Sequence, residues 1–316
     1  MSIAALKLSD DRLTTMLATA LGDVAGGLLL DDSIIELMLN PDGKLWIDRL
    51  GHGRSFTGHT MTPADAERVI FIVASSVGLT CNKDTPILSA ELPRSGSRFQ
   101  GILPPIVQRP TFTIRKRAVK IFTIDDYVSQ EMLSQVHAEI IRQAITSRKN
   151  ILIAGGTGSG KTTLTNAILN NIAATRDRVV IIEDTQELQC NADDSVSLRA
   201  KEDCASMTEL LRATMRLRPD RIVIGEVRGP EALALLKAWN TGHPGGCATL
   251  HADSAERALS RLEQLLFEAG ISSSSRLIAE AVKLIVFIEK YGVSRRVREV
   301  VEVQGFQYER YQLNRL

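Results

Sequence analysis

Aromatic residues and closely paired cysteines are scarce in this sequence. Aromatic residues make up only 4% of the 316-residue chain, too few for an extended platform on which nucleic-acid bases would stack. The four cysteines form no CxxC pair, so a structural zinc site is not expected. We expect reduced, buried thiols, as in a cytoplasmic protein. The four are Cys81, Cys190, Cys204 and Cys247.

Long apolar runs are also missing. The longest, residues 69–74 and 284–288, fall far short of the roughly 20 residues that a membrane-spanning helix needs. Asp10, Asp11 and Asp23 occupy the N-terminal region, which lacks a basic segment followed by an apolar core. No signal peptide is therefore expected. These features predict a cytoplasmic protein that reaches a membrane only peripherally, by docking to partner proteins.

An excess of charge of one sign is absent as well. The chain has 38 Lys and Arg residues against 37 Asp and Glu residues, which gives a formal net charge of +1. A net charge so close to zero argues against binding of nucleic acid or anionic lipid through the overall charge of the chain. Sequence-specific binding to nucleic acid is therefore not expected.

The length and the pattern of the chain predict two domains. We expect a small α+β domain over residues 1–120, a linker over 121–133 and an α/β domain over 134–316. In the first part, residues 34–39 and 44–48 flank a Pro-Asp-Gly turn and predict a hairpin.

Helix signals are also present in the first part of the chain. A helix is expected near residues 11–25, ending at Gly26-Gly27. Another should start at Thr62 and run to Gly78, because a capping threonine, a proline and an acidic residue follow in the usual order.

Apolar strands alternate with helices in the second part of the chain. Short apolar runs at residues 151–154, 179–182, 222–224 and 246–250 are separated by stretches with helical patterns. Such alternation is typical of a doubly wound, mainly parallel sheet covered by helices on both faces. The predicted fold class is therefore α/β for this part.

A phosphate-binding loop is expected directly after the strand at 151–154. Residues 155–162 match GxxxxGK[ST] at every position. Glycines let successive backbone N–H groups point at phosphate oxygens, the lysine reaches the β- and γ-phosphates, and the Thr162 hydroxyl can ligand Mg²⁺. The predicted nucleotide-binding residues are Gly155, Gly156, Thr157, Gly158, Ser159, Gly160, Lys161, Thr162 and Thr163. The sequence thus predicts a site for a nucleoside triphosphate with Mg²⁺.

Carboxylates follow two of the other apolar strands. Glu226 comes after residues 222–224, with Gly225 where an aspartate is usual, and can polarise the attacking water. The alternative is a surface glutamate that begins the next loop. Glu183 and Glu187 lie in a second acidic segment, which can hold metal-bound water or can be a polar loop with helix-capping acids. The residues do not decide between Glu183 and Glu187.

Histidines and arginines provide further candidates. His243 and His251 bracket a predicted strand; either can sense a γ-phosphate, and either can be structural. From Arg94 to Lys120 there are seven basic residues and no acidic one. This stretch is either a solvated strand edge or a surface that meets phosphate.

Four segments occur in a characteristic order: the phosphate loop, IEDTQEL, RPDRIVIGEVRGPEA and NTGHPGGCATLHADSAERALSRLEQL. In this the chain resembles the secretion and traffic ATPases of type IV secretion and conjugation systems over residues 30–305. That family calls the segments Walker A, Asp box, Walker B and His box. The glycine at position 225 agrees with its atypical Walker B, which keeps the glutamate.

The resemblance implies a RecA-like P-loop domain after the α+β domain and six protomers in a ring, with ATP held between the two domains. It implies that Arg98 and Arg115 approach the phosphates, and it places Glu226, Glu183, Glu187 and His251 among the catalytic candidates. Hydrolysis would power pilus biogenesis or substrate transfer, with inner-membrane and cytoplasmic channel components as partners.

Rival functions remain open at this point. One is a type II secretion or type IV pilus ATPase, although the four-cysteine insert usual in type II secretion ATPases is missing and residue 185 is threonine where "EDP" is typical. Another is a RecA-like DNA motor, which the low aromatic content and balanced charge disfavour. A third is a scaffold that ATP binding merely assembles.

Overall fold

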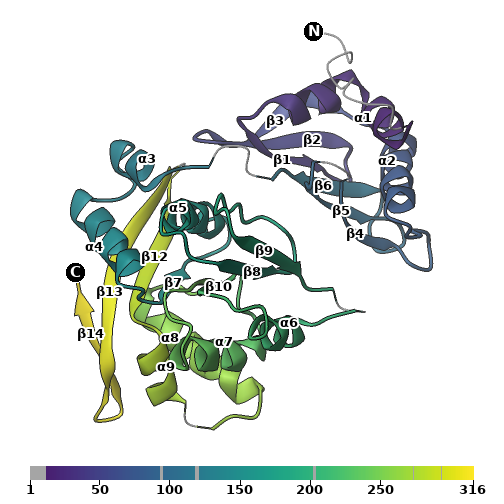
Figure 1. Ribbon diagram of the computed structural model, residues 1–316. Coiled ribbons are helices and arrows are strands. Elements are labelled where there is room, and N and C mark those ends of the chain that lie inside the picture. Colours follow the sequence, from purple (N-terminus) through teal and green to yellow (C-terminus); the bar gives the residue numbers. More distant parts are fainter. Residues whose placement is uncertain (1–11, 93–94, 118–120, 202–203, 273, 293) are drawn as a thin grey trace. The chain divides into compact units, whose positions relative to one another are not determined.

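A computed structural model describes residues 12–92, 95–117, 121–201, 204–272, 274–292 and 294–316. The chain divides into two compact units, Met1–Val119 and Lys120–Leu316. Each unit has its own hydrophobic core. Figure 1 shows the helices and strands of both units.

The described residues of the first unit form a six-stranded antiparallel sheet and two helices. The strands lie in the order β3-β2-β1-β6-β5-β4. Helix α2 packs its buried Val69, Ile70 and Val73 into the same core as Phe99 and Phe112 of the sheet. The bounds are α1 Arg12–Leu30, β1 Ile34–Leu39, β2 Lys44–Arg49, β3 Gly53–Thr60, α2 Pro63–Ser76, β4 Ile87–Glu91, β5 Arg98–Ile102 and β6 Thr111–Arg115.

Local sequence signals predicted most of these elements. The hairpin is confirmed, with Leu39 opposite Leu45. Helix α2 is also confirmed, because the Thr62 hydroxyl accepts a hydrogen bond from the amide of Asp65 at 3.2 Å. The expected end of the first helix at Gly26-Gly27 is wrong: α1 runs on to Leu30.

Packing explains the longer first helix. Leu28 and Leu29 pack against the core of the first unit, and this burial outweighs the roughly 1 kcal/mol that a glycine costs inside a helix. The glycine that interrupts the helix is Gly22, which has a φ of 74° and kinks it.

The second unit contains an eight-stranded sheet in the order β14-β13-β12-β7-β11-β10-β8-β9 among its described residues. Strands β12, β7, β11, β10, β8 and β9 are parallel, whereas β13 and β14 extend the β12 side in antiparallel fashion. This confirms the α/β, mainly parallel fold. The bounds are β7 Ile151–Ala154, β8 Val179–Glu183, β9 Ser195–Arg199, β10 Arg221–Ile224, β11 Cys247–Leu250, β12 Leu284–Tyr291, β13 Ser294–Gln307 and β14 Arg310–Arg315.

Helices cover both faces of this sheet. Ile151 and Ile153 of β7 join one core cluster with α3, α4 and α5, and Leu152 and Ala154 join the other with α6, α7, α8 and α9. Figure 1 shows α5 and α7 on opposite sides of the sheet. The bounds are α3 Ile124–Ser129, α4 Gln135–Thr146, α5 Lys161–Ala173, α6 Met207–Thr214, α7 Glu231–Asn240, α8 Ala255–Glu268 and α9 Ser275–Ala281.

The segment expected to be a linker contains a short helix. A capping box of Thr123 and Asp126 starts α3, and its Ile124 and Tyr127 are buried in the core of the second unit. The expectation that residues 121–133 act as a linker, between domains at 1–120 and 134–316, stays a prediction.

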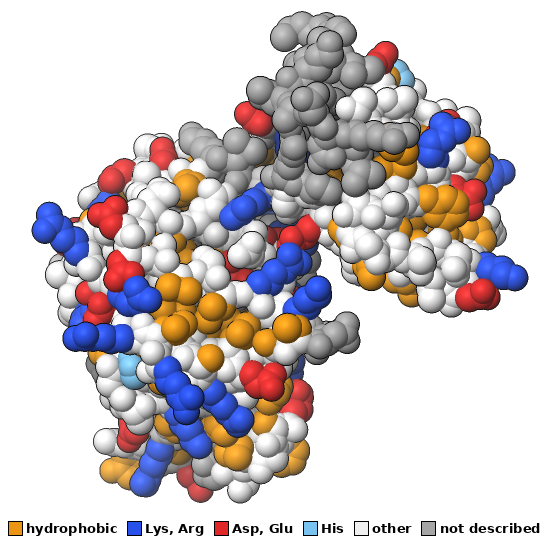
Figure 2. Space-filling view, turned by 45° about the vertical axis from the view of Figure 1, so that its right-hand side comes forward, with side chains coloured by type: hydrophobic (Ala, Val, Ile, Leu, Met, Phe, Trp, Pro, Cys, Tyr) orange, Lys and Arg blue, Asp and Glu red, His pale blue; other side chains and the backbone are white. Residues whose placement is uncertain are grey.

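Surface and thiol chemistry agree with most of the sequence expectations. Basic and acidic side chains lie interspersed on the face seen in Figure 2. In the part of the chain that the structure describes, no helix is both long and apolar enough to span a bilayer. The cysteines form no disulfide; Cys81 and Cys247 are buried as expected, whereas Cys190 is half-buried and Cys204 is exposed.

Candidate functional site

The predicted site residues of the second unit meet at one edge of the parallel sheet. Four neighbouring strands, β7, β11, β10 and β8, end together there: Leu250 is opposite Ala154, Ala248 opposite Ile224, and Ile224 opposite Ile182. The phosphate loop, His251, Glu226 and the acidic segment follow these four ends. Ligands of open α/β sheets bind at such carboxyl ends, so this edge is the candidate site.

The phosphate loop requires glycine for two reasons. Gly158 and Gly160 have φ values of +69° and +98°, a conformation that favours glycine. At Gly155 a Cβ atom would lie 2.3 Å from the carbonyl oxygen of Ile288 and 2.5 Å from the Ser159 hydroxyl. Gly160 is also the N-cap of α5, whose free backbone amides make that helix start suited to an anion.

Lys161 and Thr162 begin α5 at this loop. Lys161 is only 9% exposed, and its Nζ donates to the carbonyls of Gly155 at 2.9 Å and Gly156 at 3.0 Å. The Thr162 hydroxyl donates to Oε2 of Glu187 at 3.2 Å. Ser159 is buried, whereas Thr157 is exposed and Thr163 half-buried.

The donor set fits Mg²⁺ bound in the manner of a phosphate loop. The described residues contain no group of three or more His, Cys, Asp or Glu side chains able to enclose a metal ion. Mg²⁺ keeps several waters and commonly takes only one or two protein oxygens beside substrate phosphates. Thr162 and the adjacent Glu187 supply such oxygens.

Glu183 occupies the place where a side chain at position 225 would lie. It is 3% exposed, and its Oε1 accepts hydrogen bonds from the amides of Glu187 at 3.1 Å and Leu188 at 2.9 Å. A Cβ atom at Gly225 would stand 2.8 Å from Cγ of Glu183. The glycine found where aspartate is usual is therefore explained by a neighbouring strand's carboxylate.

Glu226 is held from two sides. Its side chain is 14% exposed, and its Oε1 lies 2.7 Å from Nε2 of His251. Its Oε2 accepts a hydrogen bond from Nη2 of Arg228. Glu226 is therefore shielded and anchored at the start of the loop, while its catalytic role stays a prediction.

His251 lies between the lysine of the loop and Glu226. Its Nε2 is 3.3 Å from Nζ of Lys161. Burial and the Lys161 ammonium lower the pKa of His251, against the opposing influence of Glu226. His243 precedes β11 and so stands at the opposite edge of the sheet, away from the loop.

Arg228 is a functional candidate that the sequence reading did not single out. Its Nη1 donates to Oδ2 of Asp184 at 2.8 Å, and its Nη2 reaches Glu226. Burial works against its charge, but the carboxylates of Glu226 and Asp184 raise the pKa of Arg228 on balance. Arg228 lies in the Walker B segment, two positions after Glu226. Its closeness to that glutamate was the only indication in the sequence that it belongs to the site.

Arg98 and Arg115 lie in the first unit, directly opposite each other on β5 and β6. Like charges in this position repel. Two carboxylates lie nearby: Nε of Arg115 is 3.8 Å from Glu36, and Glu91 of β4 stands opposite Arg98. Arg109 is exposed in the loop between these strands. Arg94 and Lys120, the ends of the basic stretch, lie outside the described residues.

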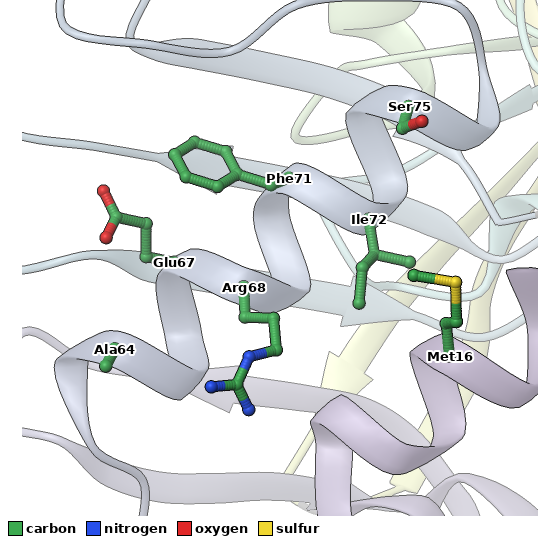
Figure 3. A pocket seen from close by; sticks show the side chains of 7 residues that line it. All are labelled: Met16, Ala64, Glu67, Arg68, Phe71, Ile72 and Ser75. Atoms are coloured by element: carbon green, nitrogen blue, oxygen red, sulfur yellow. The ribbon is translucent and has the colours of Figure 1, made fainter.

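A separate pocket of about 410 Å³ lies between α1 and α2 of the first unit. Figure 3 shows Met16 of α1 beside Ile72 of α2 at this pocket. None of the predicted site residues lines it. We therefore place the candidate site at the strand ends of the second unit.

Comparisons with known proteins give consistent results. A family model described as "Type II/IV secretion system protein" matches residues 79–307. "Conjugal transfer protein TrbB" of Rhizobium radiobacter is 53% identical over 306 residues, covering 96% of this chain and 94% of the relative. "Type IV secretion system protein PtlH" of Bordetella pertussis is 32% identical over 310 residues, covering 85% and 89%.

A solved structure supports the fold. The pilus retraction motor PilT with bound ADP superimposes with a TM-score of 0.61 at 20% identity, over 91% of this chain and 80% of that one. At that identity the likeness concerns the fold alone.

Proposed function

This chain belongs to the type II/IV secretion system ATPase family, and from that premise we propose that it works as a hexameric Mg²⁺-dependent ATPase. It powers pilus biogenesis or substrate transfer in a conjugative type IV secretion system. The observation that carries the proposal is the meeting of Lys161, Thr162, Glu187, Glu226 and His251 at one sheet edge.

The phosphate loop holds the triphosphate of ATP. Backbone amides of residues 155–163 and the ammonium of Lys161 face the phosphate oxygens. The Thr162 hydroxyl and Glu187 would hold Mg²⁺, which would neutralise phosphate charge. The contact between Thr162 and Glu187 supports this assignment.

Glu226 acts on the attacking water. Its carboxylate orients the water and accepts its proton while the water oxygen forms a bond to the γ-phosphorus. The bond from that phosphorus to the β,γ-bridging oxygen breaks, which gives ADP and phosphate. Nε2 of His251 lies 2.7 Å from Glu226 and 3.3 Å from Lys161, so it can donate to the carboxylate or accept from the ammonium.

Glu187 rather than Glu183 is the working acid of the Asp box. Both backbone amides that Glu183 accepts from belong to the loop carrying Glu187, so Glu183 acts as an anchor for that loop. Glu187 accepts a hydrogen bond from the Thr162 hydroxyl, which supports its assignment as the working acid.

Arg98 and Arg115 stabilise charge that develops on the γ-phosphate. An arginine is permanently charged and forked, which suits phosphate contact. They lie directly opposite each other on neighbouring strands, so two permanent positive charges stand side by side, which supports contact with a polyanionic phosphate group.

The partners follow from the relatives. The names of the two sequence relatives place them in conjugal transfer and type IV secretion. We therefore assign inner-membrane and cytoplasmic components of such a channel as partners, and a cytoplasmic location with peripheral membrane association. Pilus retraction is less favoured, because PilT shares only the fold.

The test measures ATP turnover and nucleotide binding on protein separated by size. Wild type should hydrolyse ATP with Mg²⁺ in a hexamer-sized fraction. Glu226→Gln should bind ATP yet hydrolyse it at least about 100-fold more slowly, since general-base catalysis is worth roughly 10²–10⁴ in rate. Lys161→Ala should lose both, whereas the matched control Lys237→Ala, on exposed α7 surface, should lose neither.

Three results would contradict the proposal. Brisk hydrolysis by Glu226→Gln would remove the base from the mechanism. Undiminished binding by Lys161→Ala would remove the phosphate loop from it. Turnover that requires DNA and accompanies strand separation would favour a DNA motor instead.

A further inference from the structure

Arg228 joins the carboxylates that follow two adjacent strands. Asp184 comes directly after β8 and Glu226 shortly after β10, and these strands are neighbours in the sheet. Nη1 of the guanidinium donates a hydrogen bond to Asp184 at 2.8 Å, and Nη2 donates one to Oε2 of Glu226. One planar, forked group thus fixes the distance between two strand ends.

The backbone that carries Arg228 is itself held. The amides of Arg228 and Gly229 both donate to Oε1 of Glu231, at 2.6 Å and 2.8 Å. Glu231 is buried in the first turn of α7. Arg228 therefore projects from a fixed point, which a residue needs if it is to orient another side chain.

A role in folding does not explain this arrangement. The side chain of Arg228 is 55% exposed and that of Asp184 is 47% exposed. Ion pairs at such exposure contribute little to stability, because water and salt screen them. The well-shielded member of the cluster is Glu226, at 14% exposure.

The geometry also selects which oxygen of Glu226 faces the phosphate loop. Arg228 binds Oε2, which leaves Oε1 directed to His251, and His251 in turn contacts Lys161. Without Arg228 only the contact with His251 holds the carboxylate, so the orientation about its terminal bond is less restricted.

We propose that Arg228 is a positioning residue, which holds the Glu226 carboxylate in the orientation needed for the reacting water by tying its Oε2 to Asp184 through the guanidinium. The inference rests on the proposed ATPase function and adds a residue to it. In this role Arg228 acts through Glu226.

The experiment compares steady-state ATP kinetics of Arg228→Gln, Arg228→Lys and Asp184→Asn with wild type. Arg228→Gln should lower kcat roughly 10- to 100-fold, the scale of a misplaced reacting group. Its KM for ATP should stay within about twofold, because the contact serves the transition state rather than binding. Arg228→Lys keeps the charge but cannot bridge both carboxylates, so its kcat should be intermediate.

Asp184 should act only through Arg228. Asp184→Asn should lower kcat less than Arg228→Gln does, and the double variant should be no slower than Arg228→Gln alone. Arg257→Gln is the matched control, because Arg257 is a surface arginine, 73% exposed and paired with Asp253. Melting temperatures of all variants show that they remain folded.

The outcomes separate this inference from the proposed function. Absence of turnover in wild type, or brisk turnover in Glu226→Gln, overturns the proposed function and this inference with it. If Glu226→Gln is inactive but Arg228→Gln is as active as Arg257→Gln, the positioning role alone is overturned. A defect confined to KM, or a double variant much slower than Arg228→Gln, overturns it as well.

Discussion

Gly225→Ala is a small change whose consequences follow directly from the structure. The added methyl carbon would stand 2.8 Å from Cγ and 3.2 Å from Oε1 of Glu183. Glu183 cannot swing aside cheaply, because it is buried and bound to the amides of Glu187 and Leu188. The variant must therefore displace either Glu183 or the end of strand β10.

The expected magnitude comes from overpacking. Inserting a carbon into a filled interior costs about 1–3 kcal/mol. For a unit the size of Lys120–Leu316, each kcal/mol lowers Tm by about 2–4 °C, so a fall of roughly 2–12 °C is expected. Displacement of Glu183 also frees the loop that carries Glu187, so ATP turnover should fall with stability.

The assay pairs a thermal melt with ATP turnover. Gly305→Ala is the control, because nothing lies within 4 Å of a Cβ atom at Gly305 and its φ is not left-handed. A Gly225→Ala protein that melts and turns over ATP like Gly305→Ala would refute the reasoning. It would show that Glu183 does not hold the loop in the manner described.

Two further predictions concern an arginine and a thiol. Arg115→Ala should lower kcat by roughly 10³-fold or more, the scale of arginine contacts to a transferring phosphoryl group, and should change ATP binding little. The control is Arg54→Ala, because Arg54 is exposed. Near-normal turnover of Arg115→Ala would exclude the role of Arg115. Burial raises the pKa of Cys247 to about 12, and the thiolate is the reactive form. At pH 8 iodoacetamide should therefore alkylate exposed Cys204 well before Cys247, as mass spectrometry of peptides would show; equal rates would contradict the buried placement of Cys247.

Local chemistry made much of the fold predictable from the sequence. Thr62 is followed by an acid at the spacing of a cap, and it starts the helix expected there. Buried parallel strands such as β7 and β8 are continuous apolar runs, which set them apart from their surroundings. The β13–β14 hairpin carries no such signal, because its buried and exposed residues mix along an edge of the sheet.

The site was predictable where its residues are close in sequence. The phosphate loop is one continuous segment, so its spacing alone defines it. In the sequence, Gly225 stands where an aspartate is usual. Only the structure shows that Glu183, at the end of β8, fills the space that a side chain at position 225 would need. The bridge from Arg228 to Asp184 joins residues 44 positions apart, and only the order of the strands brings them together.

The carbonyls of Gly155 and Gly156 give the ammonium of Lys161 partners from within its own loop. In the proposed mechanism a phosphate oxygen that approaches the lysine would replace these carbonyls, and the side chain would have little conformational freedom left to lose. The same carbonyls would accept the ammonium again after the product leaves, so each turnover would begin from the same geometry.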